Sequence, residues 1–251
     1  SASKAVYLTD NTNNQLYAYT IDRNTGLVTL AGQIATQVFP RGVLAHPAGF
    51  VYVANETTGS ISIYRIDANN APTLVTHFSV GGTPSALAMN SSGTLLYATR
   101  MGASVVSSYN IDSSTGLLTS TGFTGATDAN TNQIALHPTL PYAFTGGQAT
   151  ANAYAFHLGT NGSFTPLTGV NTGTDTFFPL LPVGGRFLFI ANNGVSRIEL
   201  YSVSSQNGAL SSLSPAFFNV GAQPGNILAD STGASLYVCI PISNSLRVFT
   251  M

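Results

Sequence analysis

Five residues of this chain have side chains that can bind a ligand and lie at positions that could come together in one site. Arg41 lies in FPRGVLAHP, at the start of an apolar stretch, and Arg100 follows the apolar stretch LLYAT. A guanidinium group forms paired hydrogen bonds with a carboxylate, and beside an amide it also suits a sugar. We therefore predict a ligand site, with no catalytic residue assigned, that consists of Arg41, Arg100, Asn132, Asp175 and Phe177. The alternative is that these residues bind no ligand and only line a water-filled channel through the centre of the fold.

The remaining polar residues suit turns better than metal binding or nucleophilic catalysis. The four histidines show no metal-ligand spacing, and no HExxH, CxxC or GxSxG motif occurs, so we expect neither a metal nor a cofactor. His46 and His137 each lie in an HP dipeptide that is typical of a turn. Cys239, in the apolar run SLYVCIP, is expected to be a small buried residue, and Glu199 is expected to face solvent from a strand. Four aspartates are expected to stabilise turns through local hydrogen bonds: Asp22, Asp67, Asp112 and Asp230.

An internal repeat explains why the candidate residues recur at matching positions. The stretch FVYVANETTGSISIYRID, residues 50–67, has counterparts along the chain. The anchor residue of each copy, spaced by 45, 45, 46, 46 and 48 residues, is Tyr7, Tyr52, Tyr97, Ala143, Phe189 or Tyr237. A second aromatic residue follows most anchors by twelve positions. Six copies at this regularity indicate a repeat architecture.

Each period of the repeat predicts four short strands and no helix. In the second copy, residues 51–55 and 60–67 alternate as strands do, and residues 73–80 and 85–90 supply two more. Asn, Asp, Ser and Gly fill the breaks between them, as tight hairpins require. Four strands in a period of about 46 residues are typical of a β-propeller. We therefore predict an all-β propeller of about six blades, forming a single domain over residues 1–251.

The first and last blades are expected to be incomplete. The chain starts on the second strand of a blade and ends on the third, which gives six strand pairs but five innermost and five outermost strands. Unpaired strand edges can pair with another chain. The terminal blades could therefore close imperfectly, be completed by residues outside this sequence, or pair with neighbouring copies.

The repeat resembles that of a known family. VYVANETTGSISIYRID, IDRNTGLVTLAG and IDSSTGLLTSTG are similar to the repeats of lactonase-type β-propellers and their YVTN-repeat relatives. The resemblance covers nearly the whole chain and implies the propeller fold. It also implies the activity class of that family, which includes 6-phosphogluconolactonase and muconate-lactonising enzymes. The motifs consist of strand and turn residues, so no catalytic residue is carried over.

The amino-acid composition limits the classes of partner that the protein could bind. Only 7% of residues are charged and the net charge is −1, so no basic patch is available for nucleic acid. No apolar run is long enough to predict a membrane-spanning helix. Low charge with abundant Ser, Thr, Asn and Gly favours an extracellular, cell-surface or periplasmic location. The expected partners are a small carbohydrate or lactone, or the protein itself through its blade edges.

Two function classes follow from these observations. The first is a non-enzymatic binding or self-assembly module, favoured by the scarcity of charge, the lack of a catalytic motif and the incomplete blades. The second is a lactone hydrolase or isomerase that acts on a sugar or muconate-type lactone at the channel mouth. The sequence favours the first class, so the protein is more simply interpreted as a non-enzyme at this stage.

Overall fold

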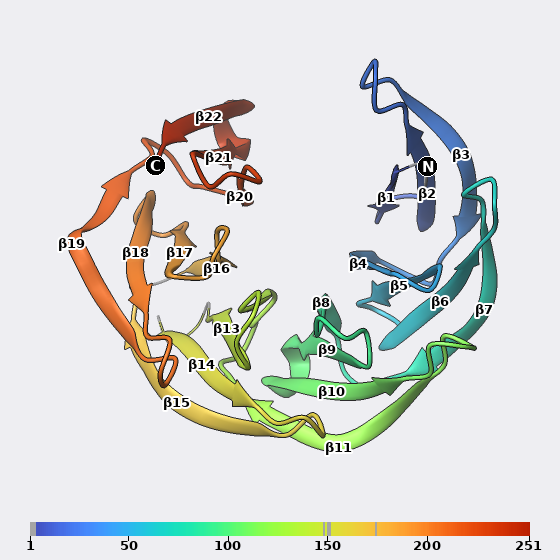
Figure 1. Ribbon diagram of the computed structural model, residues 1–251, viewed down its shortest axis with the longest axis horizontal. Helices are drawn as coiled ribbons and strands as arrows, with labels where there is room; N and C mark the ends of the chain where they lie inside the picture. The colour runs from blue at the N-terminus through green and yellow to red at the C-terminus, as the bar shows by residue number, and fades with distance from the viewer. Residues whose placement is uncertain (1–3, 148, 150–151, 174) are drawn as a thin grey trace. The chain divides into compact units, whose positions relative to one another are not determined.

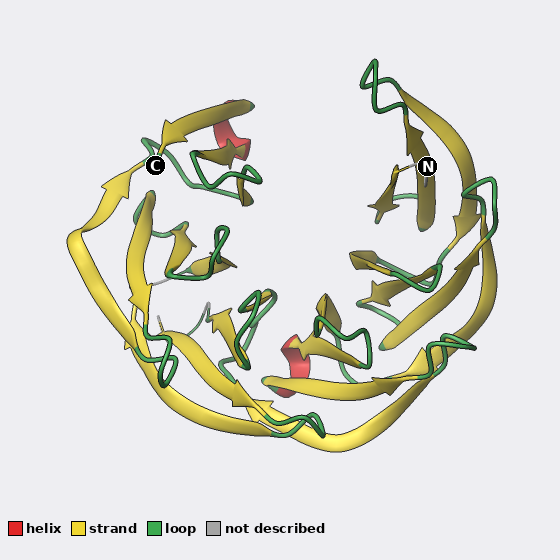
Figure 2. Cartoon of the chain, viewed as in Figure 1, coloured by secondary structure: helices red, strands yellow, loops and turns green. Residues whose placement is uncertain are grey.

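The computed structural model describes residues 4–147, 149, 152–173 and 175–251, and it is built almost entirely of β-strands. Figure 1 labels the strands in chain order, and Figure 2 shows that the helical segments are two short turns, η1 at Met101–Ala103 and η2 at Pro241–Ser243. The strands form six separate antiparallel sheets that follow one another along the chain. The predicted six-bladed all-β propeller is therefore confirmed.

The second blade shows how the repeat folds. It consists of β4 (Pro40–His46), β5 (Phe50–Asn55), β6 (Ser60–Ile66) and β7 (Pro72–Ser79), hydrogen-bonded in that order. These strands coincide with the alternating stretches of the sequence. Every residue of β5 is buried, because a strand inside a blade is covered on both faces.

Three other blades have the same four-stranded order. The third contains β8 (Pro84–Met89), β9 (Leu95–Arg100), β10 (Val105–Ile111) and β11 (Leu118–Ala126). The fourth contains β12 (Ile134–Leu136), β13 (Tyr142–Gly146), β14 (Asn152–Leu158) and β15 (Phe164–Asn171). The fifth contains β16 (Thr176–Leu180), β17 (Phe187–Asn192), β18 (Arg197–Val203) and β19 (Leu210–Asn219).

The first and last blades have three strands each, as the sequence predicts. The first contains β1 (Lys4–Asp10), β2 (Gln15–Ile21) and β3 (Val28–Ala35), which match the second, third and outermost strands of a full blade. The last contains β20 (Ile227–Ala229), β21 (Ser235–Ile240) and β22 (Ser245–Thr250), which match the innermost three.

Backbone contacts divide the chain into two compact units. The first unit comprises Ser1–Ala98 and Tyr109–Ser120, and the second comprises Thr99–Ser108 and Thr121–Met251. The boundary crosses the third blade. The single domain over residues 1–251 stays a prediction.

Buried aromatic anchors hold the blades of each unit together. In the first unit, Tyr52 packs in a core with Phe50 and Ile63, and its hydroxyl donates to the carbonyl of Gly116 at 3.0 Å. In the second unit, one core contains Phe144, the neighbour of the anchor Ala143, and another contains the anchor Phe189. Four of the six anchors, Tyr52, Tyr97, Ala143 and Phe189, are buried, and Tyr7 and Tyr237 are partly buried, so the regular spacing of the anchors reflects packing.

The two HP histidines are turn residues, as predicted. His46 Nδ1 accepts from the backbone N–H of Ala48 at 3.0 Å, and His46 Nε2 lies 2.8 Å from the carbonyl oxygen of Gly93 in the next blade. His137 repeats the arrangement: its Nδ1 accepts from the N–H of Leu140, and it contacts Gly185. Burial lowers the pKa of His137, against a smaller opposing effect of its hydrogen bond with the Gly185 backbone. Each ring therefore links one blade to the next.

The four turn aspartates also have the expected role. Asp112 is typical: its Oδ1 accepts from the N–H and the hydroxyl of Ser114 at 2.8 and 2.6 Å. These hydrogen bonds, with weaker ones from Thr115, lower the pKa of Asp112 to about 2. The other three accept comparable hydrogen bonds from backbone N–H groups two to four residues ahead.

The prediction that Cys239 is buried is wrong. The thiol is exposed, although its neighbours Val238 and Ile240 are buried. Successive side chains of a strand point to opposite faces, and Cys239 lies on the outward face of β21. The run SLYVCI is apolar on both faces, so composition does not reveal the parity of the strand.

Candidate functional site

Arg41 and Glu56 form an ion pair at one end of the second blade. Arg41 lies on β4, and Glu56 is the first residue after β5. The Arg41 Nε atom contacts Glu56 Oε2, and the two side chains are 40% and 19% exposed. The Thr9 hydroxyl of the first blade donates to the carbonyl of Arg41 at 2.7 Å. The first unit thus presents a partly exposed cation–carboxylate pair, in which the Glu56 Oε2 atom itself is buried, on a backbone that is held by two blades.

Phe39 holds the backbone that leads into Arg41 close to the backbone of Glu56. Its φ of 61° is in the left-handed region, which is costly for a bulky side chain. Two hydrogen bonds hold it: its N–H donates to Asn14 Oδ1 at 2.8 Å, and its carbonyl accepts from the N–H of Glu56 at 2.9 Å. The Arg41 guanidinium carbon lies 5.3 Å from the centre of the Phe39 ring, within the range of a cation–π contact. Phe39 therefore positions both members of the ion pair.

A buried polar network continues inward from Glu56. Asn55 Nδ2 donates to Ser62 Oγ at 2.8 Å and to Ser60 Oγ at 3.2 Å, and Ser60 also donates to Gln37 Oε1. Asn55 Oδ1 is buried and has no hydrogen-bond partner among the described residues. Such an acceptor costs about 1–3 kcal/mol. Asn55 is adjacent to Glu56 in the chain, so the carboxylate and an unsatisfied acceptor lie at the same end of β5.

Ser62 and His77 form a serine–histidine contact that does not suit catalysis. Ser62 Oγ lies 2.8 Å from His77 Nδ1. The Ser62 side chain is fully buried, however, and already accepts the hydrogen bond from Asn55. A nucleophile must reach its substrate, so this pair serves the interior of the blade.

Arg100, Asn132 and Asp175 belong to the second unit. Arg100 ends β9, and its Nη1 donates to Ser107 Oγ at 3.2 Å. Asn132 is buried two residues before β12. Asp175 has an exposed side chain and a φ of 60°, and its carbonyl accepts from the N–H of Asn193 at 2.9 Å.

Two parts of the predicted ligand site stay untested. The Phe177 side chain lies outside the described residues, although its backbone belongs to β16. Asp175 has the same backbone position in the fifth blade as Phe39 in the second. The Asp175 carbonyl accepts from the N–H of Asn193, as the Phe39 carbonyl accepts from the N–H of Glu56. Arg41 lies in the other unit, so the convergence of all five residues stays a prediction.

Asp128 is a buried carboxyl group that sequence reasoning did not select for the site. It is 5% exposed and lies beside Gly147, where a Cβ would come within 2.8 Å of Asp128 Oδ2. The backbone carbonyl of Asp128 accepts from the Thr131 hydroxyl at 3.1 Å. The absence of a side chain at Gly147 therefore makes the space that this carboxyl group occupies.

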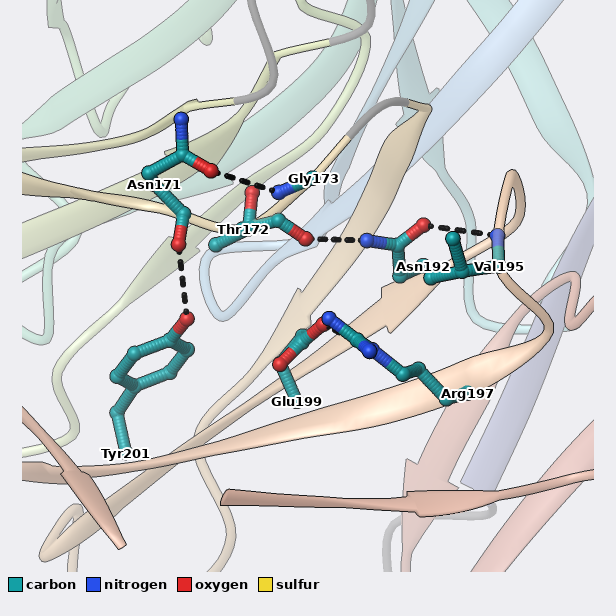
Figure 3. Close-up of polar contacts among 8 residues, drawn as sticks. All are labelled: Asn171, Thr172, Gly173, Asn192, Val195, Arg197, Glu199 and Tyr201. Atoms are coloured by element: carbon teal, nitrogen blue, oxygen red, sulfur yellow. Dashed lines mark hydrogen bonds and ion pairs between the residues drawn. The ribbon is translucent and has the colours of Figure 1, made fainter.

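A second ion pair, Arg197–Glu199, was also missed, and the expectation that Glu199 faces solvent is wrong. Glu199 is 4% exposed, and Arg197 Nε donates to its Oε1 at 2.5 Å (Figure 3). The Arg197 guanidinium lies over the ring of Phe217, 4.1 Å from its centre. Burial, and then the charge of Glu199, raise the pKa of Tyr201 to about 12. The sequence did contain one sign of this pair. Glu199 lies ten residues after the anchor Phe189, and the residues ten places after the anchors Tyr52 and Tyr97 are serines.

Figure 3 shows further hydrogen bonds near this pair, none of which is drawn to Arg197 or Glu199. Asn192 Nδ2 donates to the carbonyl of Thr172, Asn192 Oδ1 accepts from the N–H of Val195 at 3.3 Å, and the Tyr201 hydroxyl donates to the carbonyl of Asn171 at 3.5 Å. Asn192 and Thr172 are buried. Glu199 is thus enclosed, with 6% of its side chain exposed, whereas 19% of the Glu56 side chain is exposed.

Metal binding and membrane spanning find no support in the described part of the chain. No group of three or more His, Cys, Asp or Glu side chains there could hold a metal ion. Within the same residues, no helix has the length and apolar character needed to cross a membrane. The expected absence of a metal and a cofactor stays a prediction.

Comparison with known families gives a clear match. Residues 1–70 and 43–134 match the family described as Lactonase, 7-bladed beta-propeller. The two ranges together cover residues 1–134, more than half of the chain, and include both Arg41 and Glu56. The chain itself forms six blades, of which two have three strands.

Curated relatives agree with this match over a shorter segment. Two 6-phosphogluconolactonases of Yersinia pseudotuberculosis, from strains YPIII and PB1/+, are each 30% identical over 81 residues. That segment is 32% of this chain and 24% of each relative. The chain therefore matches only about a quarter of the length of these relatives.

Solved structures resemble the whole chain. A presumed 6-phosphogluconolactonase of Bacteroides fragilis has a TM-score of 0.88 and 17% identity, covering 100% of this chain and 78% of its own. A periplasmic gluconolactonase of Pseudomonas aeruginosa has a TM-score of 0.80 and 19% identity, covering 94% and 73%. At this identity the similarity shows the fold alone.

The prediction of a non-enzymatic binding or self-assembly module is wrong. The match to a lactonase family overturns it, and the curated relatives are lactone hydrolases by name. The prediction relied on the lack of a catalytic motif, but residues that are distant in the sequence can form a site without leaving a short motif. The chain belongs to the lactonase family of seven-bladed β-propellers.

Proposed function

We propose that this protein hydrolyses lactones, with Glu56 as the general base and Arg41 as the group that stabilises the developing negative charge. The observation that carries the proposal is the accessible Arg41–Glu56 pair, which lies in the part of the chain that matches the lactonase family. The backbones of both residues are held, that of Arg41 by the Thr9 hydroxyl and that of Glu56 by the Phe39 carbonyl, so the positions that carry the pair are in place before a substrate binds.

The chemistry requires only these two kinds of group. Glu56 takes a proton from a water molecule as the water oxygen attacks the lactone carbonyl carbon. The oxyanion that forms is stabilised by the Arg41 guanidinium. The ring C–O bond then breaks, and the leaving oxygen takes a proton, from protonated Glu56 or from water. The product is a hydroxy acid whose carboxylate lies against Arg41, a favourable contact for a guanidinium group.

The substrate and the location are also part of the proposal. A sugar lactone or a muconate-type lactone would offer hydroxyl or carboxylate groups to Arg41, whose side chain is 40% exposed. A periplasmic or extracellular location is supported by the 7% charge content and by the periplasmic gluconolactonase that shares the fold.

The test is a hydrolysis assay on a panel of lactones. Glucono-δ-lactone, its 6-phosphate and unsubstituted γ- and δ-lactones are followed by acid release, with spontaneous hydrolysis subtracted. Glu56→Gln should lower kcat/KM by about 10²–10⁴-fold, as expected for loss of a general base. Arg41→Ala should lower it by about 10²–10³-fold, mainly in kcat.

Arg65→Ala is the matched control. Arg65 is on β6 of the same blade, and its guanidinium also lies over an aromatic ring, 5.0 Å from the centre of Phe50. Its removal should leave the rate within a factor of two. If Glu56→Gln or Arg41→Ala retains the activity of the unmodified protein, the assigned roles are wrong. If a correctly folded sample hydrolyses none of the lactones, the proposed function is wrong.

A further inference from the structure

The turn that precedes the third strand of a blade has the same backbone form in every blade in which the structure describes it. Its last residue has a φ between 47° and 64° and is Asn14, Gly59, Ser104, Ser196 or Asn244. In four of these blades the carbonyl of that residue accepts from the N–H that follows the outermost strand, which belongs to Thr36, Val80, Thr127 or Val220. Glycine and serine at this position show that the turn does not need an asparagine side chain.

Asn14 uses its side chain for a contact with the next blade. Its Oδ1 accepts from the N–H of Phe39 at 2.8 Å. Gly59 has no side chain, and the hydroxyl of Ser104 or Ser196 is one bond closer to the backbone than the carbonyl oxygen of an asparagine. The turn therefore accounts for the backbone of Asn14 but not for its amide group.

The segment that Asn14 holds is not paired regularly within its own sheet. The pairing of β4 with β5 changes register over residues 40–43, and Arg41 lies within this bulge. Two side chains of the first blade hold the segment instead. The Asn14 Oδ1 atom accepts the N–H of Phe39, and the Thr9 hydroxyl donates to the carbonyl of Arg41. The position of Arg41 therefore depends on the first blade.

Through Phe39, the Asn14 amide acts on both members of the ion pair. The Phe39 carbonyl accepts from the N–H of Glu56 at 2.9 Å, and the Phe39 ring lies 5.3 Å from the guanidinium carbon of Arg41. A φ of 61° is unfavourable for phenylalanine, so this conformation persists only while its surroundings impose it. Loss of the hydrogen bond to Asn14 would let Phe39 relax, and both charged residues would move with it.

From this geometry we propose that Asn14 is a positioning residue for the Arg41–Glu56 pair. It holds Phe39 in the left-handed conformation and thereby sets the position of the guanidinium relative to the carboxylate. Its importance for hydrolysis rests on the proposed function, whereas its effect on the geometry rests on the hydrogen bonds alone. A displacement of a catalytic group by about 1 Å can lower a rate by about 10²-fold. The first blade thus contributes to the site without supplying a catalytic residue.

Asn14→Ser removes the amide and keeps the turn, because serine has nearly the same φ at this position in the third and fifth blades. Amide hydrogen exchange, followed by NMR, reports on the geometry without any substrate. Exchange at Glu56 should become about tenfold faster, since the Phe39 carbonyl holds its N–H less firmly. Exchange at Thr36, whose N–H donates to the backbone carbonyl of residue 14, should stay within about twofold.

Hydrolysis of the best substrate in the lactone panel tests the role in catalysis. Asn14→Ser should lower kcat by about 10–10²-fold and leave KM within about twofold, because the pair is displaced and not removed. Asn14→Asp should keep kcat within about threefold, since its carboxylate still accepts from Phe39 and aspartate tolerates a left-handed backbone. Asn244→Ser, the same change at the matching turn of the last blade, is the matched control and should leave kcat unchanged.

An unchanged kcat in Asn14→Ser, or an equal fall in Asn14→Asp, overturns the proposal. So does an equal acceleration of exchange at Thr36 and Glu56, which would mean that the whole turn has loosened. If the unmodified protein hydrolyses none of the lactones, the proposed function fails, and the two exchange rates still decide whether Asn14 positions the pair. A rise at Glu56 alone supports that role, and no rise at Glu56 overturns it.

Discussion

Removing Arg197 should destabilise the protein much more than removing Glu199. Arg197 is 28% exposed in its side chain and can turn its guanidinium to water when its partner is absent, whereas Glu199 is 6% exposed and cannot. Breaking a buried pair by removing one partner costs about 3–5 kcal/mol, because the other charge is left uncompensated. Arg197→Met should cost about 3 kcal/mol, the low end of that range, since the pair is partly solvated.

Glu199→Ser should cost only about 1 kcal/mol, as for a partly exposed ion pair. Serine is the residue at the matching positions of the second and third blades, Ser62 and Ser107, so the blade accommodates it. In a domain of this size 1 kcal/mol corresponds to about 2–4 °C in Tm. We therefore expect a fall in Tm of about 6–12 °C for Arg197→Met and about 2–4 °C for Glu199→Ser.

The double variant gives the sharper result. Arg197→Met with Glu199→Ser leaves no buried charge, so it should be more stable than Arg197→Met alone, a strong departure from additivity. Unfolding in urea is followed by circular dichroism and by tyrosine fluorescence, because two compact units could unfold separately. Equal costs for the two single variants, or strict additivity, would refute the argument that the buried Glu199 depends on Arg197.

Two further predictions test the turns. Gly185→Ala should cost about 1–3 kcal/mol more than Gly184→Ala in urea unfolding. Both residues have positive φ, but a Cβ at Gly185 would lie 2.3 Å from His137 Nε2, whereas one at Gly184 meets nothing within 4 Å; equal costs would contradict this reasoning. The Asp112 carboxyl should titrate in NMR at about 2, below its ordinary value of 3.8, and Ser114→Ala should return it towards that value. Because its pKa is depressed on folding, Asp112 stabilises the protein above about pH 4, and this contribution is lost as the pH falls towards 2. If the titration midpoint of Asp112 is unchanged in Ser114→Ala, hydrogen bonds from other residues lower its pKa.

The strands and turns of this fold could be predicted from the sequence because they repeat. Tyr52 and Tyr97 recur at one spacing because they occupy equivalent buried positions, on β5 and β9, in neighbouring blades. Asp67 and Asp112 recur since each closes the same turn. A single copy would have left these assignments open, and the six copies fix the register of the strands in each blade.

The candidate site could be predicted only in part. Arg41 was selected from its position at the start of a strand, but Glu56, its partner in the ion pair, was left outside the predicted site. The pairing of the two depends on the left-handed backbone of Phe39, whose carbonyl holds the Glu56 N–H, and sequence gives no sign of that conformation in a phenylalanine. The burial of Glu199 was missed because alternation along a strand shows which residues share a face but does not show which face is covered.

The repeat also supplies an internal reference for deciding which polar residues the fold requires. Positions that match Arg41 in other blades hold no second cation: they are Ser85, Asn132, Phe177 and Gly225. Positions that match Glu56, four residues after each anchor, hold no second acid: they are Asn11, Met101, Gly147, Asn193 and Pro241. The blades therefore fold without either charge, and structure alone does not account for the pair. Glu199 departs from the repeat in the same way, but it is enclosed by its own blade and reaches no substrate. Side-chain exposure separates the two pairs, and it supports the proposal that Arg41 and Glu56, and not Arg197 and Glu199, act on the substrate.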